Sequence, residues 1–203
     1  SRIQYEVAVF KASGGTYAAA FVSPVGIVTP SQADRAINAI ADAGDPRGWS
    51  DPHCNYFENN RNIALIHRAY AIENPDKHQG YGASAWGLTA CDAPDGYSAY
   101  SPTKDNGTIA PTAALSCMPY TPKESMEALR YFLTLGPRLW GEYGFRDAYN
   151  LDRDWFAKSY LAIDQGPIVI MIENHRTQLC WKLFMSNPEI EPALRAAGWK
   201  PVP

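Results

Sequence analysis

The fold is decided by the stretch Tyr160-Leu-Ala-Ile-Asp164-Gln165-Gly166-Pro167 and the apolar run 168–172 that follows it. Pro167 suits the first turn of a helix, where its missing N–H costs nothing, and Gly166 lets the chain bend into that turn. The helix that follows is too apolar for a surface, so we expect it to be buried on nearly all sides. Asp164 would then lie at the positive end of a buried helix, which favours an ionised carboxylate held against a polar ligand. A purely structural role, in which Asp164 and Gln165 cap the helix, is equally open.

The composition describes a chain that can build its own core and that has a neutral or small partner. It has 203 residues, of which 46% are hydrophobic, and a formal net charge of -3. The absence of a basic block argues against nucleic-acid binding, and no apolar run reaches the length of a membrane span. The sequence carries 6 Trp and 12 Tyr, many beside Gly, Pro, Asp or Asn. Such rings suit sugars, although Trp and Tyr also fill cores.

The cysteines and histidines give no metal or cofactor signature, so we predict none. The cysteines are widely separated and lack a zinc spacing; they are Cys54, Cys91, Cys117 and Cys180. We interpret them as buried thiols, with one disulfide as an option if the protein is exported. Asp105-Asn106-Gly107 resembles a calcium loop, but the twelve-residue series of ligands is missing.

Hydrophobic periodicity predicts a mainly α chain. An alternating segment at residues 3–9 favours a strand, and almost no strand signal follows residue 50. Thr121 and Glu124 form a predicted capping box, with Pro122 in the first helical turn. The predicted helices are residues 30–44, 56–73, 113–115, 122–135, 167–186 and 190–197. Aromatic and glycine-rich loops at 75–108 and 140–150 separate helices, and loops this long favour ligand binding.

Ordered blocks between residues 51 and 197 resemble the glucoamylase-like domain, which is similar to bacterial endo-β-1,2-glucanases. The blocks are Tyr56-Phe57-Glu58-Asn59, Trp86 to Asp92, Asp105 to Pro111, Trp140-Gly141 to Tyr149-Asn150, and Ile163 to Pro167 with Glu173-Asn174. The resemblance implies helical hairpins of an (α/α)6 toroid, of which this chain holds only the C-terminal half. Residues 1–50 would be a divergent N-terminal segment, and residues 51–203 the C-terminal part of the domain. The family suggests a periplasmic or secreted protein.

The resemblance further implies inverting hydrolysis of β-1,2-glucan, with a general acid that belongs to the half not found here. A second chain or an N-terminal half would complete the barrel. Inversion needs an acid and a base about 6.5–9.5 Å apart. The resemblance places Asp164 towards the cleft, and it is our first candidate for the base, followed by Asp147 and Asp92. Each has a structural alternative: Asp92 can cap a turn, and Asp147 can pair with Arg146 or Arg153.

The remaining candidates would hold an oligo- or polysaccharide. Aromatic platforms for glucose rings would be Trp86, Tyr97, Trp140, Tyr143 and Phe145, and hydroxyl partners would be Asp92, Asp147, Asn150, Gln165 and Asn174. The predicted function is therefore a glycoside hydrolase without a cofactor. The alternative is a non-catalytic carbohydrate-binding or scaffold protein derived from the same fold.

Overall fold

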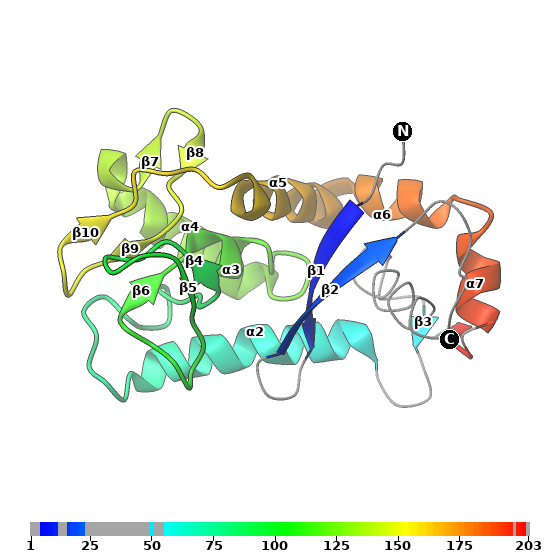
Figure 1. The fold of residues 1–203 in the computed structure, drawn as a ribbon, viewed down its shortest axis with the longest axis horizontal. Helices are drawn as coiled ribbons and strands as arrows, with labels where there is room; N and C mark the ends of the chain where they lie inside the picture. The colour runs from blue at the N-terminus through cyan, green and yellow to red at the C-terminus, as the bar shows by residue number, and fades with distance from the viewer. Residues whose placement is uncertain (1–4, 12–15, 23–48, 51–54, 197, 202–203) are drawn as a thin grey trace. The chain divides into compact units, whose positions relative to one another are not determined.

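The computed structural model describes residues 5–11, 16–22, 49–50, 55–196 and 198–201 (Figure 1). The chain divides into two compact units, of which unit 1 combines Ser1–Asn60 with Gln178–Pro203 and unit 2 is Arg61–Thr177. The helix predicted at residues 30–44 lies outside the described residues. No helix among the described residues has both the length and the apolar character needed to cross a membrane.

The described residues of unit 1 include two antiparallel strand pairs and two short helices. The strand predicted near the N-terminus is confirmed, because β1 (Tyr5–Lys11) pairs with β2 (Thr16–Val22). The other elements are β3 (Trp49–Ser50), which pairs with β11 (Lys200–Pro201), and the helices α6 (Leu179–Met185) and α7 (Ile190–Ala196). Leu194 and Trp199 form the centre of a small core, where the rings of Trp199 and Tyr56 stack 4.8 Å apart.

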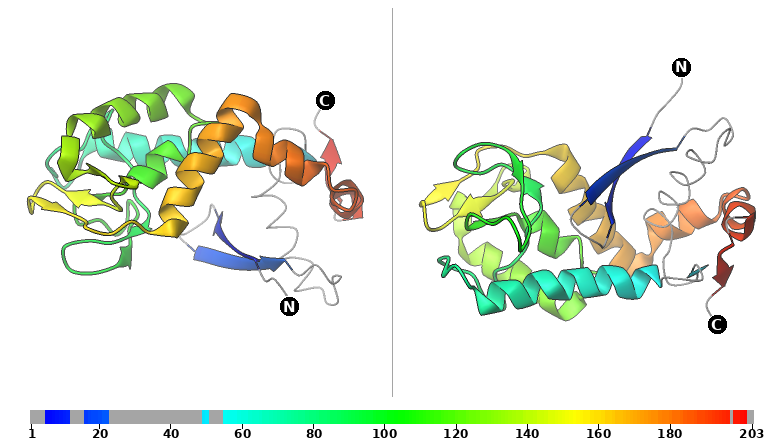
Figure 2. Two further views of the ribbon diagram at one scale, coloured as in Figure 1. Left: turned by 90° about the horizontal axis from the view of Figure 1, so that it is seen from above. Right: turned by 60° about the horizontal axis from the view of Figure 1, so that its bottom comes forward.

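The helices of unit 2 follow the predicted order, but its short strands were not predicted, because almost no strand signal follows residue 50 (Figures 1 and 2). The helices are α2 (Tyr56–Glu73), which begins in unit 1, α3 (Pro111–Leu115), α4 (Pro122–Thr134) and α5 (Ala162–Thr177), with a 3-10 turn η1 (Gly136–Arg138). The strands are β4 (Ala90–Cys91), β5 (Ser98–Ala99), β6 (Thr108–Ile109), β7 (Trp140–Gly141), β8 (Gly144–Phe145), β9 (Tyr149–Asn150) and β10 (Trp155–Phe156). These strands lie in or directly beside the two long loops; β6 ends the first loop, and β10 follows the second.

Short antiparallel pairings order the loops of unit 2. β4 pairs with β5 and β7 with β8, while β10, β9 and β6 form a three-stranded sheet in that order. In this sheet Tyr149 of β9 lies opposite Phe156 of β10 and Ile109 of β6. The long loop that contains β6 is thereby joined to the loop before α5, and α3 packs against both α4 and α5.

The structure corrects the predicted start and end of the decisive helix. α5 begins at Ala162, so Pro167 lies inside it rather than in its first turn. The Leu161 carbonyl already accepts the N–H groups of Asp164 (3.0 Å) and Gln165 (2.9 Å), and Pro167 then omits only one later bond of the helix. The helix also ends earlier than predicted, because Gln178 adopts a left-handed φ of 64° between α5 and α6.

Two expectations about helix surroundings are also wrong. Thr121 precedes α4 as predicted, but its side chain makes no cap; its hydroxyl contacts the Cys117 carbonyl (3.3 Å) and the Ser125 hydroxyl (3.1 Å). α5 is not buried on all sides, since Val169 is 69% exposed and Ile163 and Ile170 are also exposed. The described residues of this chain therefore leave one apolar face of α5 uncovered.

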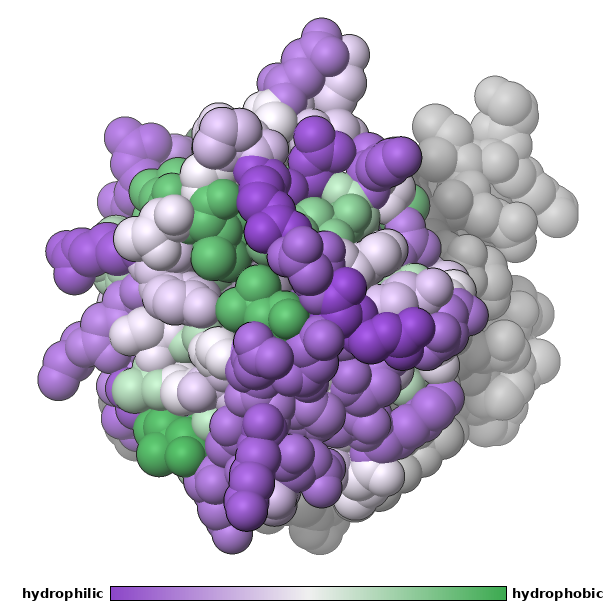
Figure 3. Space-filling model, turned by 90° about the vertical axis from the view of Figure 1, so that its left-hand side faces the viewer, coloured by the Kyte–Doolittle hydropathy of each residue, from purple (hydrophilic) through white to green (hydrophobic). Residues whose placement is uncertain are grey.

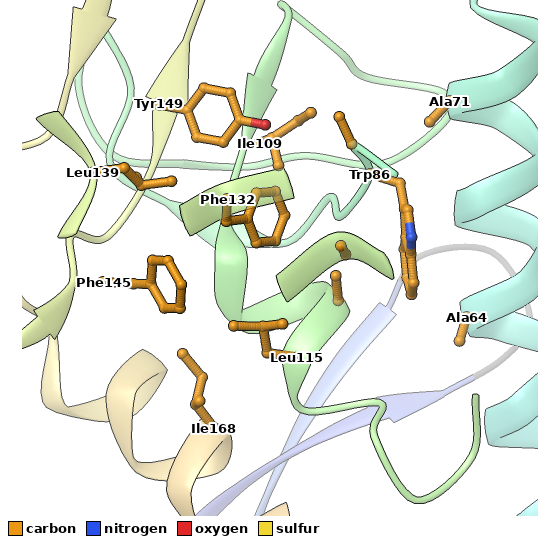
Figure 4. Packing of buried hydrophobic residues seen from close by; sticks show 13 residues of the cluster. Ala64, Ala71, Trp86, Ile109, Leu115, Phe132, Leu139, Phe145, Tyr149 and Ile168 are labelled. Atoms are coloured by element: carbon orange, nitrogen blue, oxygen red, sulfur yellow. The ribbon is translucent and has the colours of Figure 1, made fainter. Parts of the chain in front are cut away.

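The core of unit 2 centres on aromatic rings (Figure 4). Phe132 of α4 meets Phe145 and Tyr149 edge-on, each with ring centroids 6.0 Å apart. Trp86 is only 1% exposed and lies against Ala64 and Ala71 of α2. This packing attaches α2 and α4 to the loops that carry the polar residues described below.

We expect Trp86→Ala to lower the free energy of unfolding by about 3–5 kcal/mol, because it leaves a large cavity in a close-packed core. Trp140→Ala is the matched control, since Trp140 is 48% exposed, and it should cost less than about 1.5 kcal/mol. Urea unfolding of both variants measures the difference. Equal losses would contradict the assignment of Trp86 to the core.

Candidate active site

Three segments of unit 2 bring the three predicted acids together. Asp92 directly follows β4, Asp147 lies between β8 and β9, and Asp164 lies in the first turn of α5. Asp147 is 1% exposed and Asp164 is 7% exposed, whereas Asp92 is half-buried. Asp164 is thus the more accessible member of the two buried acids, and Asp147 lies behind it.

Asp147 is held by backbone groups and another carboxyl rather than by a cation. Its Oδ2 accepts the N–H of Asp92 at 2.6 Å, and its own N–H donates to the Ser159 carbonyl at 3.1 Å. The alternative pairings of Asp147 are not formed: Arg153 contacts Asp95 at 3.5 Å, and Arg146 donates to the carbonyl of Ala157 at 3.4 Å. A buried acid without a cation is costly unless it shares or keeps a proton.

The carboxyls of Asp147 and Asp164 lie close enough for each to shift the pKa of the other. Among the described residues, Asp147 Oδ1 and Asp164 Oδ2 are buried without a hydrogen-bond partner, and we infer that one proton shared between the two carboxyls satisfies both atoms. Burial, then the hydrogen bond and the charge of Asp147, raise the pKa of Asp164. Burial also raises the pKa of Asp147, but the Asp164 hydrogen bond and the Asp92 N–H oppose that shift. The Asp92 N–H favours a charged Asp147, so the proton that the pair keeps lies on the side of Asp164.

This arrangement corrects the expectation that the helix terminus keeps Asp164 ionised. Asp164 does lie in the first turn of α5, but a helix terminus contributes only about 0.3–2 kcal/mol. Desolvation and a neighbouring like charge each change the free energy of ionising a carboxyl by more than this amount. The pair consequently behaves as one unit with a single negative charge.

The pair can supply only one of the two carboxyl functions of an inverting glycosidase. Hydrogen-bonded carboxyl oxygens lie about 2.5–3 Å apart. An inverting acid and base must lie about 6.5–9.5 Å apart, so that a water fits between the base and the sugar. The second carboxyl must come from elsewhere.

Exposed aromatic rings lie in the same loops. Trp140 and Tyr143 belong to the β7–β8 hairpin, and Tyr97 directly precedes β5; all three are exposed. Gln165 Nε2 donates to the Phe145 carbonyl at 2.7 Å, which ties the first turn of α5 to this hairpin. Figure 3 shows the end of unit 2 that carries β7 to β10, where small apolar groups are separated by hydrophilic side chains. The hairpin therefore presents flat rings in a polar setting, which suits sugars.

Other predicted platforms and hydroxyl partners are structural. Trp86 is wrong as a platform, because its ring is sealed in the core, and Phe145 is 3% exposed for the same reason. Asn150 and Asn174 are buried as well; Asn150 donates to the Asn106 carbonyl at 2.9 Å and to Thr108. These side chains belong to the interior of the fold, with Asn150 on β9 and Asn174 on α5, and they do not face a ligand.

The sequence reasoning missed Ser159 and gave Tyr160 no role at the site. Ser159 Oγ donates a hydrogen bond to Asp92 Oδ2, and Tyr160 meets Tyr143 edge-on at 5.4 Å. Ser159 immediately precedes the decisive stretch, and this position could have marked it. An isolated serine without a nearby histidine carries no catalytic pattern, so the sequence alone gave no reason to choose it.

The histidines and cysteines form structural contacts. His78 Nδ1 lies 2.6 Å from Asp152 and its Nε2 lies 3.6 Å from Asp105, which joins the first long loop to the turn after β9. No group of at least three metal-ligating side chains occurs in the described ranges. Cys91 is a free, buried thiol whose pKa is raised by burial and by Asp147; Cys54 lies outside the described residues.

A mainly helical fold with an acid pair beside aromatic loops defines a class, the helical domains related to glucoamylases. The chain belongs to the family described as “Putative glucoamylase”, whose model matches residues 41–188. The predicted resemblance is therefore confirmed.

Relatives agree in fold and are much longer. The chain is 49% identical over 154 residues to an exo β-1,2-glucooligosaccharide sophorohydrolase (non-reducing end) of Parabacteroides distasonis, covering 74% of this chain and 21% of that protein. A glucoamylase-like crystal structure from Bacteroides uniformis shares 57% identity and a TM-score of 0.78, covering 79% of this chain and 39% of that one. An endo-β-1,2-glucanase from Chitinophaga pinensis, in complex with sophorotriose and glucose, shares 45% identity and a TM-score of 0.75, covering 78% and 38%. The chain spans about two fifths of the solved relatives.

The acid pair gives a testable dependence of stability on pH. The pKa of Asp164 lies above its ordinary value of 3.8, so the folded chain binds this proton more tightly than the unfolded chain. This contribution to stability is present below about pH 4 and is lost as the pH rises through the raised pKa. Asp164→Asn keeps an N–H donor towards Asp147 but cannot titrate.

We therefore expect the stability of Asp164→Asn relative to the natural chain to rise with pH, by at most about 1.4 kcal/mol per pH unit. Urea unfolding of both proteins from about pH 4 to about pH 8 measures this slope. Asp95→Asn is the control, because Asp95 is an exposed partner of Arg153. Parallel stability curves for Asp164→Asn and the natural chain would contradict the shared proton.

Proposed function

We propose that the chain is part of an inverting glycoside hydrolase that acts on β-linked glucan, and on β-1,2-glucan in particular. The observation that carries the proposal is the Asp147–Asp164 pair in loops that also present Trp140 and Tyr143. The names of the relatives support the linkage, since two of them are described as enzymes of β-1,2-glucans.

Asp164 is the proposed catalytic residue, and Asp147 is its proton acceptor. A water attacks the anomeric carbon and gives its proton to the outer oxygen of Asp164. The proton already on Asp164 Oδ2 passes at the same time to Asp147 Oδ1, and the charge of Asp147 is neutralised. The pair thus acts as one base, although Asp164, which takes the proton from the water, is uncharged before the reaction.

The proton for the leaving group comes from a carboxyl outside this chain. We propose that a further helical segment completes an (α/α)6 toroid around the pair and supplies this acid. The uncovered face of α5 supports the proposal, because Ile163, Val169 and Ile170 are exposed and nothing lies within 4 Å of a Cβ placed on Gly166. A small residue among apolar ones allows an apolar helix to approach closely.

The experiment measures sugar release from linear β-1,2-glucan by three samples. They are the chain alone, the chain mixed with the segment of the Chitinophaga pinensis enzyme that has no counterpart here, and the same mixture with Val169→Glu. We expect release only from the second sample, with the new end formed as the α-anomer, because inversion converts a β-linkage. Val169→Glu should prevent assembly while it leaves the chain folded, since Val169 is 69% exposed.

Asp164→Asn in the active mixture should lower the rate by about 10²–10⁴-fold, whereas the exposed control Asp95→Asn should not. Binding of β-1,2-glucan by the assembled sample without any release would contradict the hydrolase and identify a carbohydrate-binding protein. A β-anomeric product would contradict inversion.

A further inference from the structure

Three residues from three segments close a ring of hydrogen bonds behind the acid pair. The Asp147 N–H donates to the Ser159 carbonyl at 3.1 Å, and Ser159 Oγ donates to Asp92 Oδ2. The Asp92 N–H donates to Asp147 Oδ2 at 2.6 Å, which completes the ring. The ring joins the residue after β4, the β8–β9 connection and the segment before α5.

The ring decides which oxygen of Asp147 faces Asp164. The Asp92 N–H occupies Oδ2, so only Oδ1 remains for the shared proton. A backbone N–H that donates to a carboxylate stabilises its charged form. The direction of this N–H depends on how residue 92 is held, and the short bond from Ser159 holds its side chain.

We propose that Ser159 is a positioning residue that acts through Asp92 to keep the charge on Asp147 and the proton on Asp164. Without the hydroxyl, the Asp92 carboxylate loses its donor and turns towards water, and its N–H no longer points at Asp147 Oδ2. The first ionisation of the pair then becomes harder. The catalytic consequence of this distribution of charge and proton rests on the proposed hydrolase, but the distribution itself does not.

Other charged or titratable groups around the pair do not replace the effect of Ser159 and Asp92 on its ionisation. The Cys91 thiol on β4 stays neutral, because burial and the nearby carboxyls raise its pKa. The Arg146 guanidinium lies 5.7 Å from the Tyr160 ring centroid and donates to Ala157. Among the described residues, Asp92 is the group that both contacts Asp147 and is held by Ser159.

A second reading is that Ser159 only ties loops together. The two readings differ in what a variant changes. A loop tie would alter stability alone, whereas a positioning residue also alters the titration of the pair. Ser125 of α4 provides the matched control, because it is fully buried and its hydroxyl contacts that of Thr121.

The experiment follows the carboxyl ¹³C signals of Asp147 and Asp164 with pH in the 203-residue chain labelled at aspartate. Asp147→Asn and Asp164→Asn assign the signals. We expect Ser159→Ala to move the first ionisation of the pair upward by about one pH unit, and Ser159→Thr, which keeps the hydroxyl, to restore it. Ser125→Ala should leave it unchanged.

An unchanged titration in Ser159→Ala would overturn the inference, as would an equal shift in Ser125→Ala. If Ser159→Ala does not fold, Ser159→Cys provides the test, because its weaker donor should give a smaller shift in the same direction. These measurements need no hydrolysis. A normal titration shift without sugar release would therefore count against the proposed function alone.

Discussion

The polar centre of unit 2 depends on one constraint, the closeness of the buried carboxyls of Asp147 and Asp164. Two carboxylates cannot both be ionised at this separation in a buried site, so the pair keeps one proton. That constraint connects the start of α5 to the β8–β9 loop and, through the Asp92 N–H, to β4. The same constraint leaves the pair with one charge, and the two carboxyls lie too close together to be both the acid and the base of an inverting enzyme.

The apolar core packs against the residues that form this polar centre. Phe145 packs on Phe132, while its carbonyl accepts the bond from Gln165, so one residue joins the core to the first turn of α5. Trp86 packs against α2 and so holds the long loop of residues 75–108 in place. Polar groups buried in a close-packed frame have little freedom to move apart, and the acids are held by neighbours that are themselves fixed. The loops are therefore held in place by packing despite their length.

The sequence predicted the positions of the helices better than the environments of the acids. Pro122, Gly136 and the apolar spacing of α2 and α4 are local signals, and they placed those helices well. The start of α5 was wrong because Pro167 is tolerated inside a helix whose first turn is closed by Leu161. Trp86 was wrongly predicted to face a sugar because the local sequence Trp86-Gly87 does not distinguish a core Trp from a surface Trp. The charge of Asp164 depends on Asp147, seventeen residues away, and no local pattern contains that contact.

We infer that one proton lies between Asp147 and Asp164. Neutron diffraction from crystals of the deuterated chain at neutral pH tests this inference, because it locates deuterons on individual oxygens. We expect a single deuteron between the two carboxyls, bonded to Asp164 Oδ2 and directed at Asp147 Oδ1. Two bare carboxylates, or a deuteron on each, would contradict it.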